Sequence, residues 1–263
     1  MVKVYIDQLG NTIKLQCSPC RIISLVPSIT ELLFDLTSEN RIAAVTDYCV
    51  HPASKVLSIP KVGGTKKIDV SYIRNLKPDF VIASKEENIK SQVEEIQTFC
   101  PVWVSDVQNL DSAISMIREL GIILEEHENA SGIIEKVQFQ LDKFTPPDKI
   151  RTLYMIWRKP YMTVGKDTFI HDIMTRVGLV NVMGSNRYPV VSSEQISLLS
   201  PDLILLSSEP YPFKEHHMAE LSKLCPHAAV LLVDGEIFSW YGSRLFHSAR
   251  YFEELWKRIL KEK

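Results

Sequence analysis

Few residues in this sequence have the spacing of known catalytic or metal-binding motifs. Cys17-Ser-Pro-Cys20 has the spacing of redox pairs and zinc knuckles, but zinc needs a second pair, and the other three cysteines do not provide one. A thioredoxin-type pair follows a strand and opens a helix, whereas this pair precedes an expected strand. An ordinary loop is therefore the favoured interpretation, and we expect no metal site and no cofactor here.

Other catalytic patterns are also missing. Gly165-Lys-Asp-Thr168 lacks the earlier glycine, and the Ser or Thr directly after Lys, that a phosphate-binding loop requires. The sequence contains no Gly-x-Ser-x-Gly, His-Glu-x-x-His or Gly-x-Gly-x-x-Gly motif. His216 and His217 are adjacent and point in different directions, which favours a solvated pair over a metal site. We assign no catalytic residue and expect a protein that is not an enzyme.

Aromatic side chains, in contrast, gather in segments that follow expected strands. They are Tyr48, Trp157, Tyr161, Tyr211, Phe213, Trp240 and Tyr241, with Arg244 close behind. The carboxyl ends of parallel strands carry the ligand crevice of α/β sheets. A single ring is more often part of a local core. As a set, the rings predict a binding wall for a large, flat or partly apolar ligand.

Alternating strand and helix patterns must position these loops. Residues 2–15 alternate as a hairpin, Ser28-Ile-Thr-Glu31 is a capping box that starts a helix, and Asp234-Gly235 predicts a turn. Buried strands are expected at 21–25, 42–45, 102–104, 152–156 and 230–233. Helices are expected at 89–99, 111–120, 127–144, 169–177 and 243–260. The pattern predicts an α/β fold with mainly parallel sheets flanked by helices.

A loose internal repeat predicts two such sheets. Residues 71–84 align with residues 194–207, sharing Ile, Leu, Pro-Asp and a final Ser, and Glu86 then falls opposite Glu209. In each copy a short helix stops at a proline and an apolar strand follows. We therefore expect two Rossmann-like lobes, residues 1–124 and 147–263, joined by one long backbone helix at 125–146. Such lobes would hold a small ligand in a cleft between them.

Composition narrows the classes of partner. The chain has 263 residues, of which 45% are hydrophobic, and a net charge of −2. This charge gives no excess of basic residues for binding nucleic acid or an anionic membrane. No apolar run approaches the roughly 18 residues that span a bilayer. The first residues lack the apolar core of a signal peptide, so we expect either a cytoplasmic chain or the loss of an export segment. The odd number of cysteines, five, does not indicate a disulfide framework.

Several short segments together resemble a known family. They are 21–33, 46–52 (Thr-Asp-Tyr-Cys-Val-His-Pro), 61–64 (Lys-Val-Gly-Gly), 76–83 and 233–242. In this order they are similar to the helical-backbone substrate-binding proteins of ABC importers, which take up vitamin B12, haem and iron siderophores. The resemblance covers essentially the whole chain and is closest to the cobalamin-binding branch. It implies two α/β lobes joined by one helix, as the repeat predicts independently.

The resemblance also implies roles for individual residues. In the family an acidic residue at the apex of each lobe docks onto a membrane permease; the matching positions here are Glu194 and Ser71, so one charge is missing. Asp69 is a candidate substitute, and equally a helix N-cap. The first-lobe positions that match ligand-flanking rings of the cobalamin-binding relative are His51, Thr65 and Lys85. His51 could ligate cobalt or iron, although a hydrogen-bonded loop histidine is the favoured interpretation.

These expectations combine into one functional hypothesis. The chain would be a monomeric binding protein that captures a metal chelate, most simply a corrinoid and otherwise haem or a ferric siderophore, for an ABC importer. Trp157, Tyr161, Trp240 and Tyr241 would line the ligand, with polar contacts from Arg244, Tyr48 and Glu86. Its location would be periplasmic or otherwise extracytoplasmic. The alternative is a cytoplasmic metallocofactor chaperone, sensor or enzyme subunit with the same fold.

Overall fold

A computed structural model describes residues 2–262 of the chain. Tertiary contacts divide it into two compact units. Unit 1 comprises the chain up to Val107, Asp111–Val137 and Tyr241–Arg244, and unit 2 comprises Gln108–Leu110, Gln138–Trp240 and the chain from Leu245. The expected lobe boundaries, near residues 124 and 147, stay predictions.

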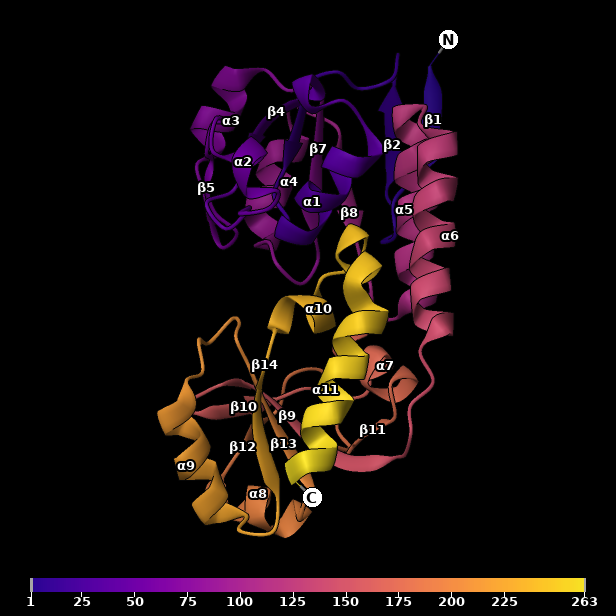
Figure 1. Ribbon diagram of the computed structural model, residues 1–263. Coiled ribbons are helices and arrows are strands. Elements are labelled where there is room, and N and C mark those ends of the chain that lie inside the picture. The colour runs from indigo at the N-terminus through magenta and orange to yellow at the C-terminus, as the bar shows by residue number, and fades with distance from the viewer. Residues whose placement is uncertain (1, 263) are drawn as a thin grey trace. The chain divides into compact units, whose positions relative to one another are not determined.

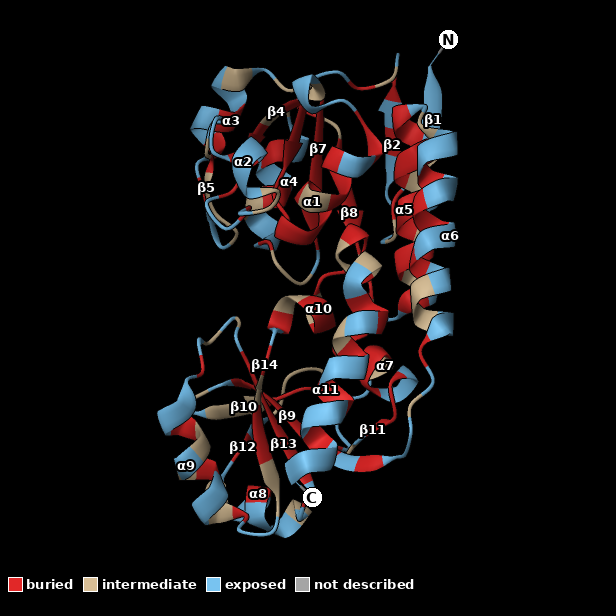
Figure 2. Ribbon diagram, viewed as in Figure 1, coloured by how far each residue is buried: buried red, intermediate tan, exposed pale blue. Residues whose placement is uncertain are grey.

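Unit 1 is built on a four-stranded parallel sheet. Its strand order is β4-β3-β7-β8, with β3 (Ile22–Ser24), β4 (Ile42–Val45), β7 (Phe80–Ser84) and β8 (Val102–Ser105). All residues of β3, β7 and β8 are buried, which explains why these strands read as continuous apolar runs and not as alternating ones (Figure 2).

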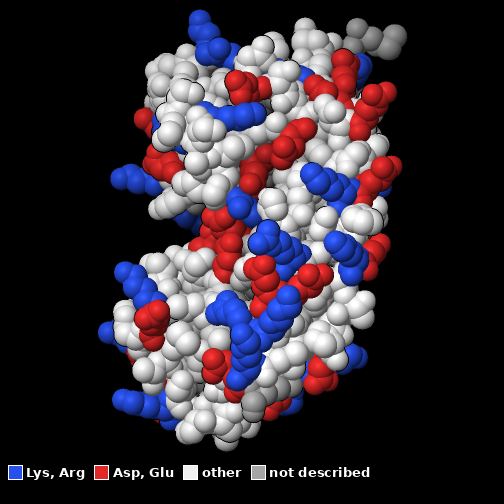
Figure 3. Space-filling model, viewed as in Figure 1, with Lys and Arg blue, Asp and Glu red and all other residues white. Residues whose placement is uncertain are grey.

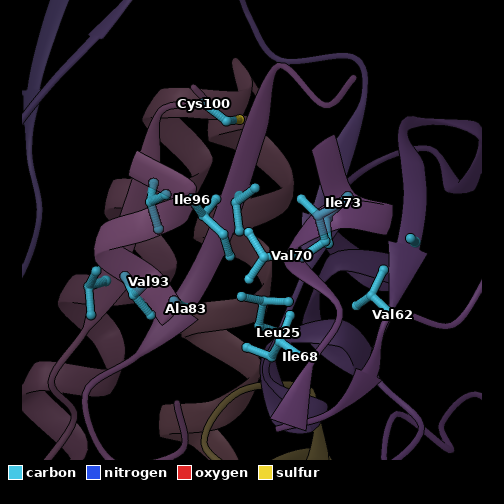
Figure 4. Close-up of a cluster of buried hydrophobic side chains, with 14 residues drawn as sticks. Leu25, Val62, Ile68, Val70, Ile73, Ala83, Val93, Ile96 and Cys100 are labelled. Carbon is cyan, nitrogen blue, oxygen red and sulfur yellow. The ribbon is translucent and has the colours of Figure 1, made fainter. Parts of the chain in front are cut away.

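Helices cover this sheet and complete its core. They are α1 (Pro27–Leu36), α2 (Ala53–Val56), α3 (Val70–Leu76), α4 (Lys90–Gln97) and α5 (Leu110–Leu124), with a 3-10 turn at Glu39–Arg41. Helix α6 (His127–Lys143) follows α5 and belongs to unit 1 as far as Val137. Figure 4 shows Val70 and Ile73 of α3, with Val93 and Ile96 of α4, directed toward Ala83 of β7. The apolar positions three residues apart on each helix therefore form one face against the sheet.

Two hairpins and a helix pair complete unit 1. The hairpin predicted over residues 2–15 is formed by β1 (Lys3–Ile6) and β2 (Thr12–Leu15) and turns through Gly10 at φ 84°. A second hairpin joins β5 (Gly63–Gly64) to β6 (Lys67–Ile68). Helices α5 and α6 lie side by side (Figure 1). A Cβ atom on Gly121 would lie only 2.4 Å from the Cβ of Ala130, so glycine permits this close approach.

Unit 2 is also built on a mainly parallel sheet. Strands β9 (Ile150–Trp157), β11 (Leu179–Asn181), β13 (Leu203–Ser207) and β14 (Ala229–Val233) run parallel, and β10 (Tyr161–Thr163) and β12 (Val190–Val191) add an antiparallel edge. Its helices are α7 (Phe169–Arg176), α8 (Ser193–Leu199), α9 (Glu215–Leu224), α10 (Gly235–Ser239) and α11 (Ser248–Glu262). A 3-10 turn at Ser243–His247 begins in unit 1 and ends in unit 2. The sequence did not predict β10, β11, β12 or α9.

The repeat is reproduced element by element. Helix α8 and strand β13 lie 123 residues after α3 and β7, with the same lengths. Each helix ends in a left-handed residue, Lys77 or Ser200. In unit 1 Arg21 donates to the carbonyl oxygen of Leu76, and in unit 2 Arg151 donates to that of Leu199. Each unit is thus an α/β sheet flanked by helices, as the sequence predicted.

Three local predictions were wrong. Helix α1 begins at Pro27 after Val26 and has no side-chain cap, so Ser28 and Glu31 form no capping box. A proline at the first helical position already fixes the helical φ and needs no N–H partner. Asp234 is the N-cap of the short helix α10 instead of part of a turn. The expected C-terminal helix starts as a 3-10 turn, and its α-helical part begins at Ser248.

The surface carries both signs of charge. Lys and Arg side chains are interspersed with Asp and Glu over the face shown in Figure 3. Helix α11 gives an example, since Arg250 and Glu254 form a pair at 2.9 Å one turn apart. Within residues 2–262, no helix is both long and apolar enough to cross a membrane.

Candidate ligand-binding site

In unit 1 the loop after β4 presents Tyr48. This side chain is 63% exposed, and its ring lies beside Gly64, where a Cβ atom would come within 3.1 Å of the ring. The backbone N–H of Asp47 donates to the Gly63 carbonyl at 2.9 Å and ties this loop to the β5–β6 hairpin. Tyr48 is therefore an accessible ring at the carboxyl end of the sheet.

Hydrogen bonds bring the loop after β7 to the same hairpin. The buried Asn88 side chain donates to the Thr65 carbonyl at 3.1 Å and to the Leu25 carbonyl at 3.2 Å. Lys66 donates to the Glu86 carbonyl at 2.6 Å. Tyr48, Thr65 and Glu86, all predicted ligand residues, consequently lie in one group of adjoining loops.

The remaining first-lobe candidates are polar. His51 is half-buried, three residues beyond Tyr48, and is followed by a cis peptide bond to Pro52. Lys85 forms an ion pair with Asp106 at 2.6 Å. Within the described residues no group of three or more His, Cys, Asp or Glu side chains could hold a metal ion. This face of unit 1 thus offers hydroxyl, imidazole and carboxylate groups around one exposed ring.

A groove of about 750 Å³ lies beside Tyr48 on unit 1. Its lining includes Asp47, Lys67 and Glu95, and it reaches Ser71 in the first turn of α3. Asp69, also in the lining, is the N-cap of α3 and accepts from the Tyr72 N–H at 2.8 Å. Ser71 and Glu194 occupy corresponding, exposed positions in α3 and α8.

In unit 2 the carboxyl end of β9 carries an aromatic cluster, formed by Trp157, Tyr211, Phe213 and His217. Trp157 is 39% exposed and meets the Tyr211 ring edge-on, with ring centroids 5.6 Å apart. Tyr211 in turn packs on Phe213 at 4.8 Å, and its hydroxyl lies 3.3 Å from Nε2 of His217. His217 is buried, so the prediction of a solvated histidine pair was wrong for this residue. Burial lowers its pKa, and the ring is held as a neutral partner. The cluster orients the exposed Trp157 ring.

An ionic cluster joins Arg158, in the loop after β9, and Tyr161, the first residue of β10, to α9. Glu220 accepts from Arg158 at 2.6 Å and also from the Tyr161 hydroxyl. The hydrogen bond from Arg158 lowers the pKa of Glu220. Burial, followed by the effect of Glu220, raises the pKa of Tyr161 to about 12. Tyr161 is therefore a neutral donor whose hydroxyl is already committed to Glu220.

Trp240 is anchored by the half-buried carboxylate of Glu209. Its indole N–H donates to Oε1 of Glu209 at 2.9 Å, and the Ser239 hydroxyl donates to the same oxygen at 2.7 Å. Burial raises the pKa of Glu209. Only 6% of Trp240 is exposed, so this ring offers little surface in the structure.

Tyr241 and Arg244 belong to unit 1. Tyr241 is 8% exposed, its hydroxyl faces Ser105 and Ser84, and burial raises its pKa. Arg244 contacts both carboxylate oxygens of Glu31, at 2.9 and 3.0 Å. The polar groups of these two predicted ligand residues thus already interact with side chains of unit 1.

Sequence reasoning missed the partners that hold the candidate residues. Asn88, Arg158 and Glu220 were not singled out, and Glu31 was noted only as part of a capping box and not as the partner of Arg244. Glu220 gave no usable signal because α9 itself was not predicted. Asn88 could have been found, since it lies four residues after Ser84, the end of the repeat strand. In the structure its side-chain oxygen accepts from the Ser84 N–H at 2.8 Å.

Comparisons with known proteins identify relatives over most of the chain. Residues 22–223 match the family described as periplasmic binding protein. A vitamin B12-binding protein of Vibrio campbellii is 28% identical over 194 residues, covering 71% of this chain and 70% of the relative.

Two solved structures share the fold. A periplasmic vitamin B12-binding protein of Vibrio cholerae superposes with a TM-score of 0.77 at 22% identity, covering 93% of this chain and 99% of the other. A periplasmic haem-binding protein of Pseudomonas aeruginosa gives 0.75 at 20% identity, covering 89% and 93%. Because the family match covers more than half of the chain, with the whole sheet of unit 1 and all strands of unit 2 except β14, the chain belongs to the periplasmic binding protein family.

Proposed function

We propose that this protein is the extracytoplasmic substrate-binding protein of an ABC importer and captures a metal chelate for delivery to a membrane permease. The family match over residues 22–223 carries the proposal. A corrinoid is the preferred ligand because relatives 26–28% identical are vitamin B12-binding proteins, with haem or a ferric siderophore next. The alternative of a cytoplasmic chaperone, sensor or enzyme subunit is not favoured, since these relatives are binding proteins.

The ligand would contact loops at the carboxyl ends of the strands. Trp157 is our main stacking residue, because it combines an exposed ring with the support of the aromatic cluster. Tyr48 would provide a second accessible ring, and Thr65, His51 and Glu86 would provide polar contacts. We retain Tyr161, Trp240, Tyr241 and Arg244 as proposed ligand residues. To contact the ligand, each of them must release its present protein partner or bind both partners at once.

For delivery, we propose that Glu194 of α8 contacts the permease. Its exposed carboxylate lies in the first turn of α8, where the Ser192 hydroxyl lowers its pKa and so keeps it charged. Ser71 holds the equivalent place in α3 without a charge, and Asp69 two residues earlier carries the nearest carboxylate on that helix.

Calorimetric titration of the purified protein with cyanocobalamin, haem and a ferric siderophore tests the ligand class. The proposal expects saturable heat with one chelate, and with cyanocobalamin in the preferred case. Metal-free protoporphyrin and free iron serve as controls for apolar adsorption and metal capture. Absence of saturable binding with all three chelates would contradict the proposal.

A further inference from the structure

The five cysteines fall into two groups. Cys49, Cys100 and Cys225 are buried, whereas Cys17 and Cys20 are exposed, and all five are free thiols. Burial raises the pKa of Cys100 to about 12, which makes this thiol inert toward electrophiles at neutral pH. Reagents in solution therefore meet the Cys17/Cys20 pair first.

The two residues between these cysteines are fixed by the rest of unit 1. The Ser18 hydroxyl donates to the Leu124 carbonyl at 3.0 Å and accepts from Nη2 of Arg41 at 2.8 Å. Nε of Arg41 donates to the Pro19 carbonyl at 2.8 Å. Because hydrogen bonds to Leu124 and Arg41 fix Ser18 and Pro19, the loop is ordered and its two cysteines face solvent together.

A carboxylate contacts one thiol of the pair. Oδ2 of Asp79 accepts from the backbone N–H of Cys20 at 2.8 Å and from its thiol at 3.2 Å. The hydrogen bond to Asp79 raises the pKa of Cys20, and the nearby Cys17 adds a smaller effect in the same direction. Cys20 is thus kept as a thiol whose proton already points to an acceptor, while Cys17 has no such restraint among the contacts of the structure.

We propose that Cys17 and Cys20 form a redox-active dithiol site that closes to a disulfide by exchange with a small-molecule disulfide such as glutathione disulfide. Cys-x-x-Cys spacing suits such closure, and the exposed pair is accessible to the co-reactant. The proposal goes beyond the binding function above and does not rest on it.

The exchange proceeds in two balanced steps. The Cys17 thiolate attacks one sulfur of the small disulfide, whose S–S bond breaks as one small thiolate leaves and takes a proton from water. Cys20 then passes its proton to Asp79 and attacks the Cys17 sulfur, expelling the second small thiolate, which takes that proton. Two protein thiols are oxidised to one disulfide, and one small disulfide is reduced to two thiols.

Incubation with glutathione disulfide, acid quenching, N-ethylmaleimide labelling and mass spectrometry test the proposal. Wild-type protein should lose two labelled thiols, at Cys17 and Cys20, without retaining glutathione. Cys20→Ser should stop at a mixed disulfide on Cys17 that persists on the order of 100-fold longer, because the intramolecular displacement is removed. Cys225→Ser keeps the pair and should close like wild type. Persistent glutathione on the wild-type pair, or two thiols that remain labelled, would overturn the proposal.

Phenylarsine oxide provides a measurement that needs no oxidation. A trivalent arsenical is retained where two thiols can bind it together, so it should protect both cysteines of the wild type from N-ethylmaleimide. It should protect neither Cys20 in Cys17→Ser nor Cys17 in Cys20→Ser. Lack of protection in the wild type would show that the two thiols cannot meet and would equally overturn the site.

Discussion

At the scale of single residues, exposure separates the candidate ligand residues. Trp157 and Tyr48 are 39% and 63% exposed, whereas Trp240 and Tyr241 are 6% and 8% exposed. The sequence could predict that these residues follow strands, because the local sequence pattern indicates where a strand ends. Burial of Tyr241 could not be predicted, since it depends on serines of distant strands. Glu31 and Arg244 form their pair across 213 residues of sequence.

The exposed Trp157 ring gives the first prediction. Trp157→Leu should weaken binding of the chelate by roughly 2- to 10-fold, the equivalent of about 0.5–1.5 kcal/mol of aromatic stacking. Phe139→Leu removes another exposed ring of unit 2, on α6 and away from any strand end, and should leave the affinity unchanged. Calorimetric titration of both variants measures the difference. Equal affinities for wild type and Trp157→Leu would remove Trp157 from the site.

Glu209 gives a pH-dependent prediction. Burial raises its pKa, so the folded protein binds this proton more tightly than the unfolded chain. The resulting stability is fully present below the ordinary carboxyl pKa and is lost as the pH rises through the raised one. Glu209→Gln should therefore gain stability relative to wild type as the pH rises above the ordinary carboxyl pKa of about 4.3.

Urea unfolding at a series of pH values measures this effect. The exposed Glu253→Gln is the matched control and should follow the wild-type pH profile. A parallel profile for wild type and Glu209→Gln would show that Glu209 titrates alike in the folded and unfolded chains.

Asp79 allows a prediction about thiol reactivity. In a Cys17→Ser background, Asp79→Asn should speed alkylation of Cys20 by iodoacetamide at pH 7, because removing the carboxylate lowers the pKa of Cys20 and raises its thiolate fraction. A stopped time course followed by mass spectrometry gives the rate. An unchanged or slower rate would exclude the proposed effect of Asp79 on this thiol.

At the scale of elements, the repeat predicts matched effects in the two units. Asp69 caps α3, and Ser192 caps α8 in a reciprocal box with Gln195. Asp69→Ala and Ser192→Ala should each cost about 1 kcal/mol of stability. Ser71→Ala changes an exposed residue inside α3 that is not a cap and should stay within about 0.5 kcal/mol.

Urea denaturation followed by circular dichroism compares these three variants. A loss for Ser71→Ala as large as that for the caps would contradict this account of the helix starts. The sequence predicted both helices through their prolines and apolar spacing, yet it placed a capping box at Ser28, where none forms. The capping pattern was misread because Pro27 starts α1 without a side-chain cap.

At the scale of the whole molecule, the α/β class followed from local periodicity and the repeat, and the structure confirms it. Unit membership was harder to anticipate, because it depends on tertiary contacts. Tyr241–Arg244 belongs to unit 1, although the chain before and after it belongs to unit 2. The other boundary between the units lies inside α6, after Val137. The periodicity of apolar residues does not reveal that a short segment such as Tyr241–Arg244 packs in the other unit.

Equilibrium dialysis of cyanocobalamin against the purified full chain tests whether this protein binds a corrinoid. We predict saturable binding that approaches one cobalamin per chain and is weakened by Trp157→Leu but not by Phe139→Leu. Equal cobalamin concentrations on both sides of the membrane at all protein concentrations would contradict the choice of a corrinoid as the ligand.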